Sequence, residues 1–111
     1  MSKYKVDLCG INTSSLKVLS NEENINLFNK MKNGDPFARE ELIHGNLKLV
    51  LAILKKFNNQ VDNLDDLFQV GCLGLVKAID NFDMSYNVTL STYACPLIIG
   101  EMKRYIRDNT S

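Results

Sequence analysis

The sequence predicts an all-α protein, a compact helical bundle of about four to five helices behind an N-terminal arm. Two observations carry this prediction. Apolar residues recur at spacings of three and four over most of residues 36–82, as on the buried face of a helix. Residues that commonly cap helices stand at the starts of the expected segments. No strand pattern of comparable length competes with these helices.

Composition limits the class of protein. The chain has 111 residues, of which 45% are hydrophobic and 23% charged, enough for one core but not two. No apolar run is long enough to cross a bilayer, and the first residues lack the apolar part of a signal peptide, so we expect a cytoplasmic protein. Cys9, Cys72 and Cys95 show no C-x-x-C spacing, which favours reduced thiols over a disulfide framework or a zinc site. We expect no cofactor.

The chain divides into an arm, residues 1–19, and a helical domain, residues 20–111. The arm has no clean period, but its isolated apolar residues are too many for a disordered tail, so it should lie on its own domain or on a partner. Ser20 and Glu23 have the spacing of a capping box at the start of the first helix. Its apolar stripe consists of Ile25, Phe28 and Met31. The pair Asn33-Gly34 should end it in a left-handed cap.

The next helical pattern runs from Pro36 to Phe57, with Asp35 as N-cap and Pro36 at the first helical position. Gly45 is its weak point, where we expect a bend or a close helix crossing. The pair Asn58-Asn59 should end it. The apolar positions are Phe37, Leu42, Ile43, Leu47, Val50, Leu51, Leu54 and Phe57.

Two further helices follow. Asn63 should cap one of them, in which Gly71 and Gly74 would let a neighbouring helix approach closely. Its apolar positions are Leu64, Leu67, Phe68, Leu75, Val76 and Ile79. After a polar loop, Ser91 is the expected N-cap of the last helix, which contains Pro96 and should be kinked or delayed by it.

The helix that begins near residue 64 carries a candidate docking face. Asp65, Asp66 and Gln69 should share one accessible side, and carboxylates beside an amide suit the arginines of a basic protein. The alternative is a solvated face whose N-terminal acids favour the helix dipole, and spacing alone favours that alternative.

The loop and the last helix suggest a nucleic-acid face. Aromatic and hydroxyl side chains are followed at helical spacing by basic ones, a combination typical of single-stranded nucleic-acid binding. They are Phe82, Tyr86, Leu90, Ser91, Thr92 and Tyr93, then Lys103, Arg104 and Arg107. The residues alone leave a core role for the aromatics equally open. No enzyme constellation appears, because His44 is the only histidine and lacks a partner at catalytic spacing.

Three ordered segments together resemble domain two of bacterial sigma factors. They are GNLKLVLAILKKF at 45–57, DDLFQVGCLGLVKAIDNFD at 65–83 and STYA at 91–94. The segment DLCGINTSSLKVL at 7–19 looks like the leader of the late-forespore, sigma-G-like sporulation sigma factors. The resemblance implies a helical bundle that initiates transcription in the cytoplasm of the forespore.

The resemblance also implies roles for particular residues. One helix would bind the clamp helices of the RNA polymerase beta-prime subunit through Asp65, Asp66, Gln69, Val70, Cys72, Leu73 and Val76. The non-template strand of the minus-ten promoter element would meet Phe82, Asp83, Tyr86, Leu90, Ser91, Thr92 and Tyr93, with a flipped base held near Tyr93. Lys103, Arg104 and Arg107 would touch the backbone or the upstream duplex.

This sequence departs from the housekeeping pattern at several positions. Val70 and Cys72 make the polymerase face less polar, and Pro96 and Leu97 replace the aromatic wedge that opens the duplex. The hypothesis is weaker promoter melting, which restored aromatics at Pro96 and Leu97 should relieve. The chain stops at Ser111, so we expect an excised or truncated sigma factor without its later domains.

Regulation by an anti-sigma protein is the last expectation from the resemblance, with a small zinc-binding protein of the Gin kind as partner. Its footprint is predicted at Asn46, Leu47, Val50, Asp66 and Gln69, and the zinc would belong to the partner. A competing hypothesis is an interaction domain that only binds the anti-sigma protein and has no DNA activity.

Overall fold

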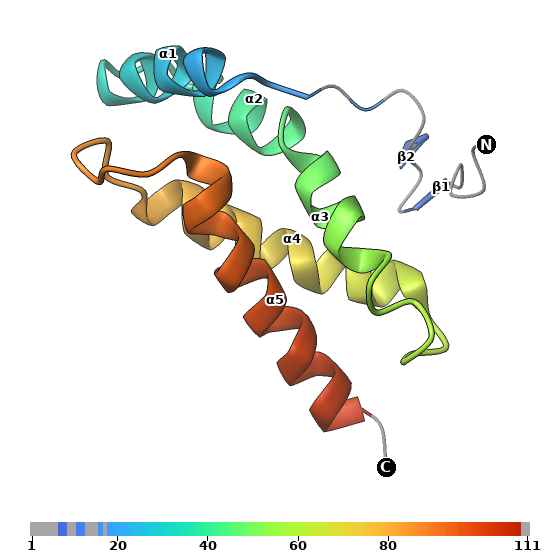
Figure 1. Ribbon diagram of the computed structural model, residues 1–111. Helices are drawn as coiled ribbons and strands as arrows, with labels where there is room; N and C mark the ends of the chain where they lie inside the picture. The colour runs from blue at the N-terminus through green and yellow to red at the C-terminus, as the bar shows by residue number, and fades with distance from the viewer. Residues whose placement is uncertain (1–6, 9–10, 13–15, 17, 110–111) are drawn as a thin grey trace.

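The computed structural model describes residues 7–8, 11–12, 16 and 18–109, and the described part is a helical bundle (Figure 1). Its helices are α1 (Asn21–Lys32), α2 (Ala38–His44), α3 (Leu47–Leu54), α4 (Leu64–Asn81) and α5 (Leu90–Asn109). The all-α prediction is therefore confirmed. Two short antiparallel strands, β1 (Asp7–Leu8) and β2 (Ile11–Asn12), precede the helices, with Leu8 opposite Ile11.

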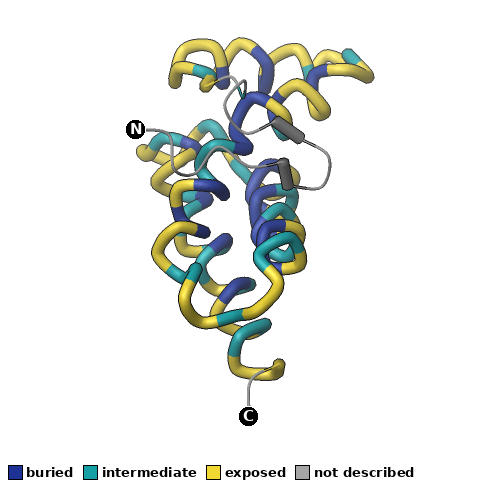
Figure 2. The backbone as a smooth tube through the Cα atoms, turned by 90° about the vertical axis from the view of Figure 1, so that its right-hand side faces the viewer, coloured by how far each residue is buried: buried dark blue, intermediate teal, exposed yellow. Residues whose placement is uncertain are grey.

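The helices α4 and α5 form the most extensive interface of the bundle, and α3 packs across both of them. The helix α1 packs on α2, at the end of the bundle where the α4–α5 loop lies (Figure 1). Buried residues line the inner sides of the helices and exposed residues the outer sides (Figure 2). The largest fully buried side chains include Phe68, Leu67 and Leu75 from α4 and Ile98 and Met102 from α5. The core is thus built mainly on the α4–α5 pair.

The glycines of α4 allow this pair to pack closely, as the sequence predicted. A Cβ atom added to Gly74 would lie 2.7 Å from the Ile98 Cα and 2.8 Å from the Leu97 carbonyl oxygen, both backbone atoms of α5. A Cβ added to Gly71 would collide with the side chains of Met102 and Val50. Pro96 does lie inside α5, on its exposed side.

The helix expected from Pro36 to Phe57 is divided into α2 and α3, which sharpens the bend predicted at Gly45. The Leu19 side chain occupies the space where a Gly45 Cβ would be, and the Leu19 amide donates to the Gly45 carbonyl at 3.0 Å. The Asn46 side chain donates to the Leu42 carbonyl at 2.7 Å and to Asn24 Oδ1 at 3.0 Å, both in the interior. These local bonds compete with a continuous helical ladder. The helix α3 also ends at Leu54, earlier than the predicted Asn58-Asn59.

Most of the predicted caps are present. Ser20 and Glu23 form a reciprocal capping box, with bonds of 3.1 and 2.8 Å. Gly34 has a φ of 95°, in the left-handed region that favours glycine. Asn63 Oδ1 accepts from the Asp66 amide at 3.1 Å.

Two caps differ from the prediction. Asp35 Oδ1 accepts from the Phe37 amide at 2.9 Å, but this bond closes a turn ahead of α2, whose N-cap position is Phe37. The helix α5 begins at Leu90, where Thr89 Oγ1 accepts from the Thr92 amide at 3.3 Å. The capping hydroxyl is therefore that of Thr89 and not that of Ser91.

Two predicted apolar positions are on the surface. Phe37 is 70% exposed because it stands in the turn before α2, and Ile25 is 41% exposed because α1 turns Asn24 and Leu27 inward instead. Leu16 and Leu19 are partly buried against the core, so this part of the expected arm lies on its own domain.

The described residues also bear on membrane, thiol and metal chemistry. None of the described helices combines the length and apolarity needed to span a bilayer. Cys72 and Cys95 form no disulfide, whereas Cys9 lies outside the described residues. Within the described ranges, no group of three or more side chains is suited to hold a metal ion.

Candidate protein and nucleic-acid interfaces

The outward side of α4 presents a mixed polar and apolar ridge. Asp66, Gln69 and Leu73 are exposed at helical spacing, and Leu73 is 56% exposed. The other predicted docking residues are half-buried beside this ridge, namely Asp65, Val70, Cys72 and Val76. The predicted set therefore forms one continuous strip on α4, which we call the α4 ridge. The α4 ridge thus offers polar groups at Asp66 and Gln69 and an exposed apolar side chain at Leu73.

One end of the α4 ridge contacts α5. The Tyr105 hydroxyl donates to Asp66 Oδ2 across 3.4 Å. Partial burial, and secondarily the negative charge of Asp66, raise the pKa of Tyr105 above its usual value, so the hydroxyl keeps its proton and can donate. A partner that binds Asp66 would therefore also meet the C-terminal half of α5.

Four aromatic rings meet at the corner where α4 passes into α5. The Phe82 ring lies 5.0 Å from that of Phe28, 5.5 Å from that of Tyr93 and 5.9 Å from that of Tyr86. Tyr86 and Tyr93 lie 5.5 Å apart. Phe82 and Tyr93 are half-buried, whereas Tyr86 is 44% exposed. The aromatic corner thus closes the core on one side and faces solvent on the other, so the core role is present and one side remains accessible to a partner.

A hydrogen-bonded turn at residues 83–86 holds Tyr86 on the exposed side of the aromatic corner. Asp83 Oδ1 accepts from the Ser85 amide at 2.8 Å, and the Asp83 carbonyl accepts from the Tyr86 amide at 2.9 Å. The bond from Ser85 lowers the pKa of Asp83, so this carboxylate stays ionised at neutral pH. Ser91 and Thr92 are exposed nearby on the first turn of α5, but Leu90 is only 1% exposed. Leu90 belongs to the core because α5 begins at this residue, two positions earlier than expected from Ser91 as N-cap.

Two open hollows flank the aromatic corner. One, of about 360 Å³, lies between α1 and the loop and is lined by Phe28, Phe82 and Tyr86 together with amide and hydroxyl groups such as those of Asn87 and Thr89. The other, of about 700 Å³, lies between the end of α1 and the end of α4 and is more polar. Both fall within the rough range of 300–1,000 Å³ for small-ligand sites. Flat apolar walls with polar groups at the rim can accept an unstacked base.

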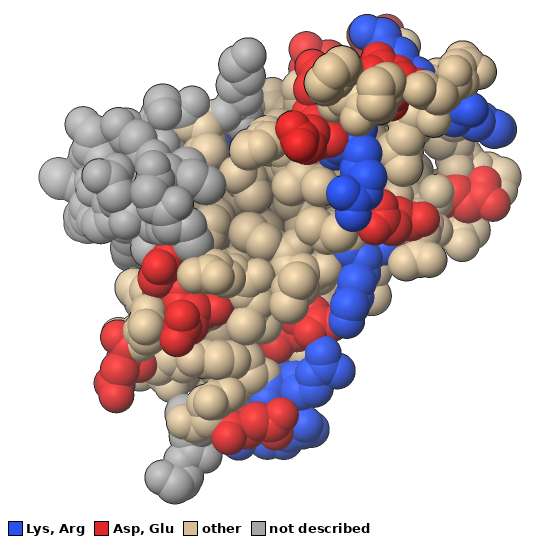
Figure 3. Space-filling view, turned by 180° about the vertical axis from the view of Figure 1, so that it is seen from behind, with Lys and Arg blue, Asp and Glu red and all other residues tan. Residues whose placement is uncertain are grey.

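The C-terminal part of α5 carries fewer unpaired positive charges than the sequence suggests. Lys103, Arg104 and Arg107 are exposed as predicted, but Arg104 pairs with Glu101 and Arg107 pairs with Asp108 at 3.0 Å. On the face shown in Figure 3, which is seen from behind the view of Figure 1, basic and acidic side chains lie next to one another. Much of the predicted charge is therefore already neutralised within the protein.

Part of the predicted anti-sigma footprint is not on the surface. Asn46, Leu47 and Val50 are 6%, 4% and 0% exposed; the Asn46 side chain bonds to Asn24 of α1, and Val50 lies against Gly71 of α4. Only Asp66 and Gln69 of that set are exposed. In this conformation a partner would therefore reach the α4 ridge but not the side chains of Asn46, Leu47 and Val50.

Sequence reasoning missed two ion-pair arrangements. The Arg39 guanidinium binds the Asp80 carboxylate through two bonds of 2.7 and 2.9 Å, which joins α2 to α4. Glu101 is held between Lys77 and Arg104. The first pair spans 41 positions, so no local pattern indicates it. The only sequence signal for the second was the spacing of three between Glu101 and Arg104.

Comparison with known proteins identifies the class. Residues 42–111 match the family described as Sigma-70 region 2, which is more than half of the chain. The chain therefore belongs to the sigma-70 region 2 family, as the resemblance suggested.

Among the individual relatives are sigma-G and sigma-F factors of RNA polymerase. The chain is 58% identical over 110 residues to the RNA polymerase sigma-G factor of Bacillus subtilis (strain 168), which covers 98% of this chain and 42% of that protein. It is 56% identical over 109 residues to a putative RNA polymerase sigma-G factor of Bacillus thuringiensis subsp. kurstaki, covering 98% and 87% respectively. A sigma-F factor of Bacillus licheniformis is 48% identical over 91 residues. The chain thus spans about two fifths of the length of its Bacillus subtilis relative.

Proposed function

We propose that this chain is the part of a sporulation sigma factor that binds core RNA polymerase and recognises the minus-ten promoter element. Membership of the sigma-70 region 2 family and similarity to sigma-G factors support the proposal. The structural observation that carries it is the position of the aromatic corner at the end of the same helix that presents the α4 ridge. One rigid helix would then fix a polymerase contact relative to a promoter contact. Its chemistry is binding, without a covalent step.

The α4 ridge is the proposed contact for the clamp helices of the polymerase beta-prime subunit. Asp66 and Gln69 would receive hydrogen bonds from basic partner side chains, while Leu73 would supply the buried apolar centre. Asp65, Val70, Cys72 and Val76 would line its edge.

The aromatic corner is the proposed contact for the non-template strand. The exposed face of Tyr86 is available for stacking, and the half-buried Phe82 and Tyr93 would form the wall behind a flipped base. Asp83, Ser91 and Thr92 would supply polar contacts at the rim. Lys103, Arg104 and Arg107 would meet the phosphate backbone.

Reciprocal variants test the two contacts. Binding of the chain to isolated beta-prime clamp helices should fall with Asp66→Ala, Gln69→Ala and Leu73→Ala, each of which removes an exposed side chain and spares the core. Binding to a fluorescent minus-ten single strand should be unchanged in these variants and should weaken in Tyr86→Ala by about 1–3 kcal/mol per stacked base lost. The assignment would be wrong if Tyr86→Ala impaired clamp binding and left strand binding intact.

A second candidate function is an interaction domain that binds an anti-sigma protein without using a DNA face. The interleaved charges on α5 favour it, since they weaken electrostatic attraction to DNA. The α4 ridge would be the docking surface, and a zinc-binding protein of the Gin kind would bring its own metal. Strand binding separates the two candidates: a chain that binds the clamp helices but no minus-ten strand supports the second.

A further inference from the structure

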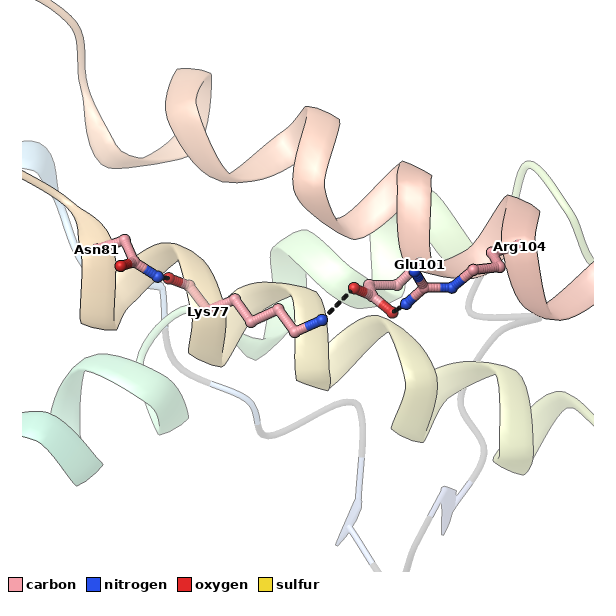
Figure 4. A network of polar contacts seen from close by, with 4 residues as sticks. All are labelled: Lys77, Asn81, Glu101 and Arg104. Atoms are coloured by element: carbon pink, nitrogen blue, oxygen red, sulfur yellow. Dashed lines mark hydrogen bonds and ion pairs between the residues drawn. The ribbon is translucent and has the colours of Figure 1, made fainter.

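The acid Glu101 lies between two helices and holds two cations. Its carboxylate binds the Lys77 ammonium of α4 through Oε2 at 2.6 Å and the Arg104 guanidinium of α5 through Oε1 (Figure 4). The side chain of Glu101 is 13% exposed, whereas those of Lys77 and Arg104 are 55% and 56% exposed. The acid is therefore inside the network and the two cations are at its outer edge.

Its two partners keep the Glu101 carboxylate in its ionised form. The hydrogen bond from Lys77, and secondarily that from Arg104, lower the pKa of Glu101, so the carboxylate stays ionised at neutral pH. The backbone carbonyl of Lys77 is itself held by the Asn81 side chain at 2.8 Å. Two cations, one on each helix, thus share one carboxylate, and each is directed toward it (Figure 4).

This arrangement changes which charges on α5 can meet DNA. Arg107 is paired with Asp108, and Arg104 with Glu101. Lys103 is exposed, and within the described residues no salt bridge is recorded for it. A phosphate that approaches α5 must therefore compete with carboxylates for every cation of the predicted basic set except Lys103.

We propose that Glu101 is a positioning residue that limits the affinity of the α5 face for double-stranded DNA by keeping Lys77 and Arg104 in ion pairs. The inference rests on the proposed function, since it assumes that this face meets DNA. It implies that the ion pairs of the folded protein keep its binding to duplex DNA weak. Stable binding to a promoter would then depend on the contacts of the aromatic corner with a specific strand. The fold itself would thereby reduce binding at unrelated sequences.

Counterion release gives the expected size of the effect. Each additional phosphate contact steepens the plot of log K against log salt by about 0.9 and strengthens binding roughly eightfold at about 0.1 M salt relative to 1 M. Glu101→Gln should therefore increase affinity for duplex DNA by roughly eightfold if one cation is released and by roughly sixtyfold if both are.

The test measures the affinity of the whole 111-residue chain for a short fluorescein-labelled duplex of mixed sequence, by anisotropy over a range of potassium chloride concentrations. Glu101→Gln should bind more tightly with a steeper salt dependence. Glu22→Gln, an exposed acid in the first turn of α1, makes the same change in net charge away from the network and should leave the salt slope unchanged. Equal effects in the two variants would overturn the proposal, because net charge alone would then explain them.

A double-mutant cycle keeps the proposal testable if Glu101→Gln also loosens the fold. Arg104→Gln should change duplex affinity little in the wild-type chain and should remove much of the gain in the Glu101→Gln chain. Lys103→Ala reports on the proposed function separately. If the Glu101→Gln chain binds no duplex, or binds it equally well after Lys103→Ala is added, the nucleic-acid face itself is wrong; if Lys103→Ala weakens wild-type binding but Glu101→Gln does not strengthen it, only the role of Glu101 is wrong.

Discussion

Gly74→Ala is the sharpest test of how α4 and α5 are packed. The new Cβ would lie 2.7 Å from the Ile98 Cα and 2.8 Å from the Leu97 carbonyl oxygen, both backbone atoms that cannot rotate away. Overpacking of this kind costs about 1–3 kcal/mol, and the upper part of that range applies because the obstacle is backbone. The gain in helix propensity from glycine to alanine offsets about 1 kcal/mol. The expected net loss is about 1–2 kcal/mol, or about 4–8 °C in Tm.

Gly100→Ala is the matched control for this substitution. Gly100 lies in the middle of α5, it is exposed, and a Cβ added there has no neighbour within 4 Å. The same chemical change should therefore stabilise the fold by about 0.5–1 kcal/mol. Urea unfolding followed by circular dichroism measures both variants. The packing argument fails if Gly74→Ala is as stable as Gly100→Ala.

The remaining predictions concern buried amides, an ion pair and a cap. Asn46→Ala should cost about 1–3 kcal/mol in urea unfolding, because it leaves the buried Asn24 amide oxygen without its donor; a neutral result would contradict this. The Arg39 guanidinium lowers the pKa of Asp80, so its stabilisation, at most about 1 kcal/mol at this exposure, is present above about pH 4 and is lost as the pH falls through the lowered pKa. Asp80→Asn should accordingly flatten the acid limb of a stability–pH curve, and an unchanged limb would refute the assignment. Ser20→Ala should lower the free energy of unfolding by about 1 kcal/mol, because the capping hydroxyl is lost, and a thermal melt should show a lower Tm. An unchanged Tm would contradict a stabilising role of the capping box.

Local signals in the sequence were sufficient for much of the fold. The capping box at Ser20 and the left-handed Gly34 depend on residues within a few positions, and both were predicted correctly. The close packing at Gly71 and Gly74 followed from the cost of glycine inside a helix, which needs a compensating contact. At Gly45 the sequence predicted a bend but not the division into two helices. The side chain that occupies the space beside Gly45 comes from Leu19, which is too distant in the sequence for a local pattern to indicate it.

The candidate site was predictable in its members but not in their accessibility. A two-residue difference in the start of α5 placed Leu90 in the core, and the orientation of α1 left Ile25 exposed. Helical periodicity does not resolve such shifts near a helix end. Pairing of charges between helices, as in Arg39 with Asp80, depends on tertiary geometry and leaves no local pattern.

The short connection between α4 and α5 has a consequence for the order of folding. These two helices share the largest interface in the bundle, and only residues 82–89 separate them. Closing so short a loop costs little entropy, so we expect this helical hairpin to form in the folding transition state, before α1 and α2 dock. Gly74→Ala should then slow refolding about as much as it destabilises the native state, whereas an effect confined to unfolding would place the hairpin later. The two proposed interfaces would in that case be positioned relative to each other from the first stage of folding.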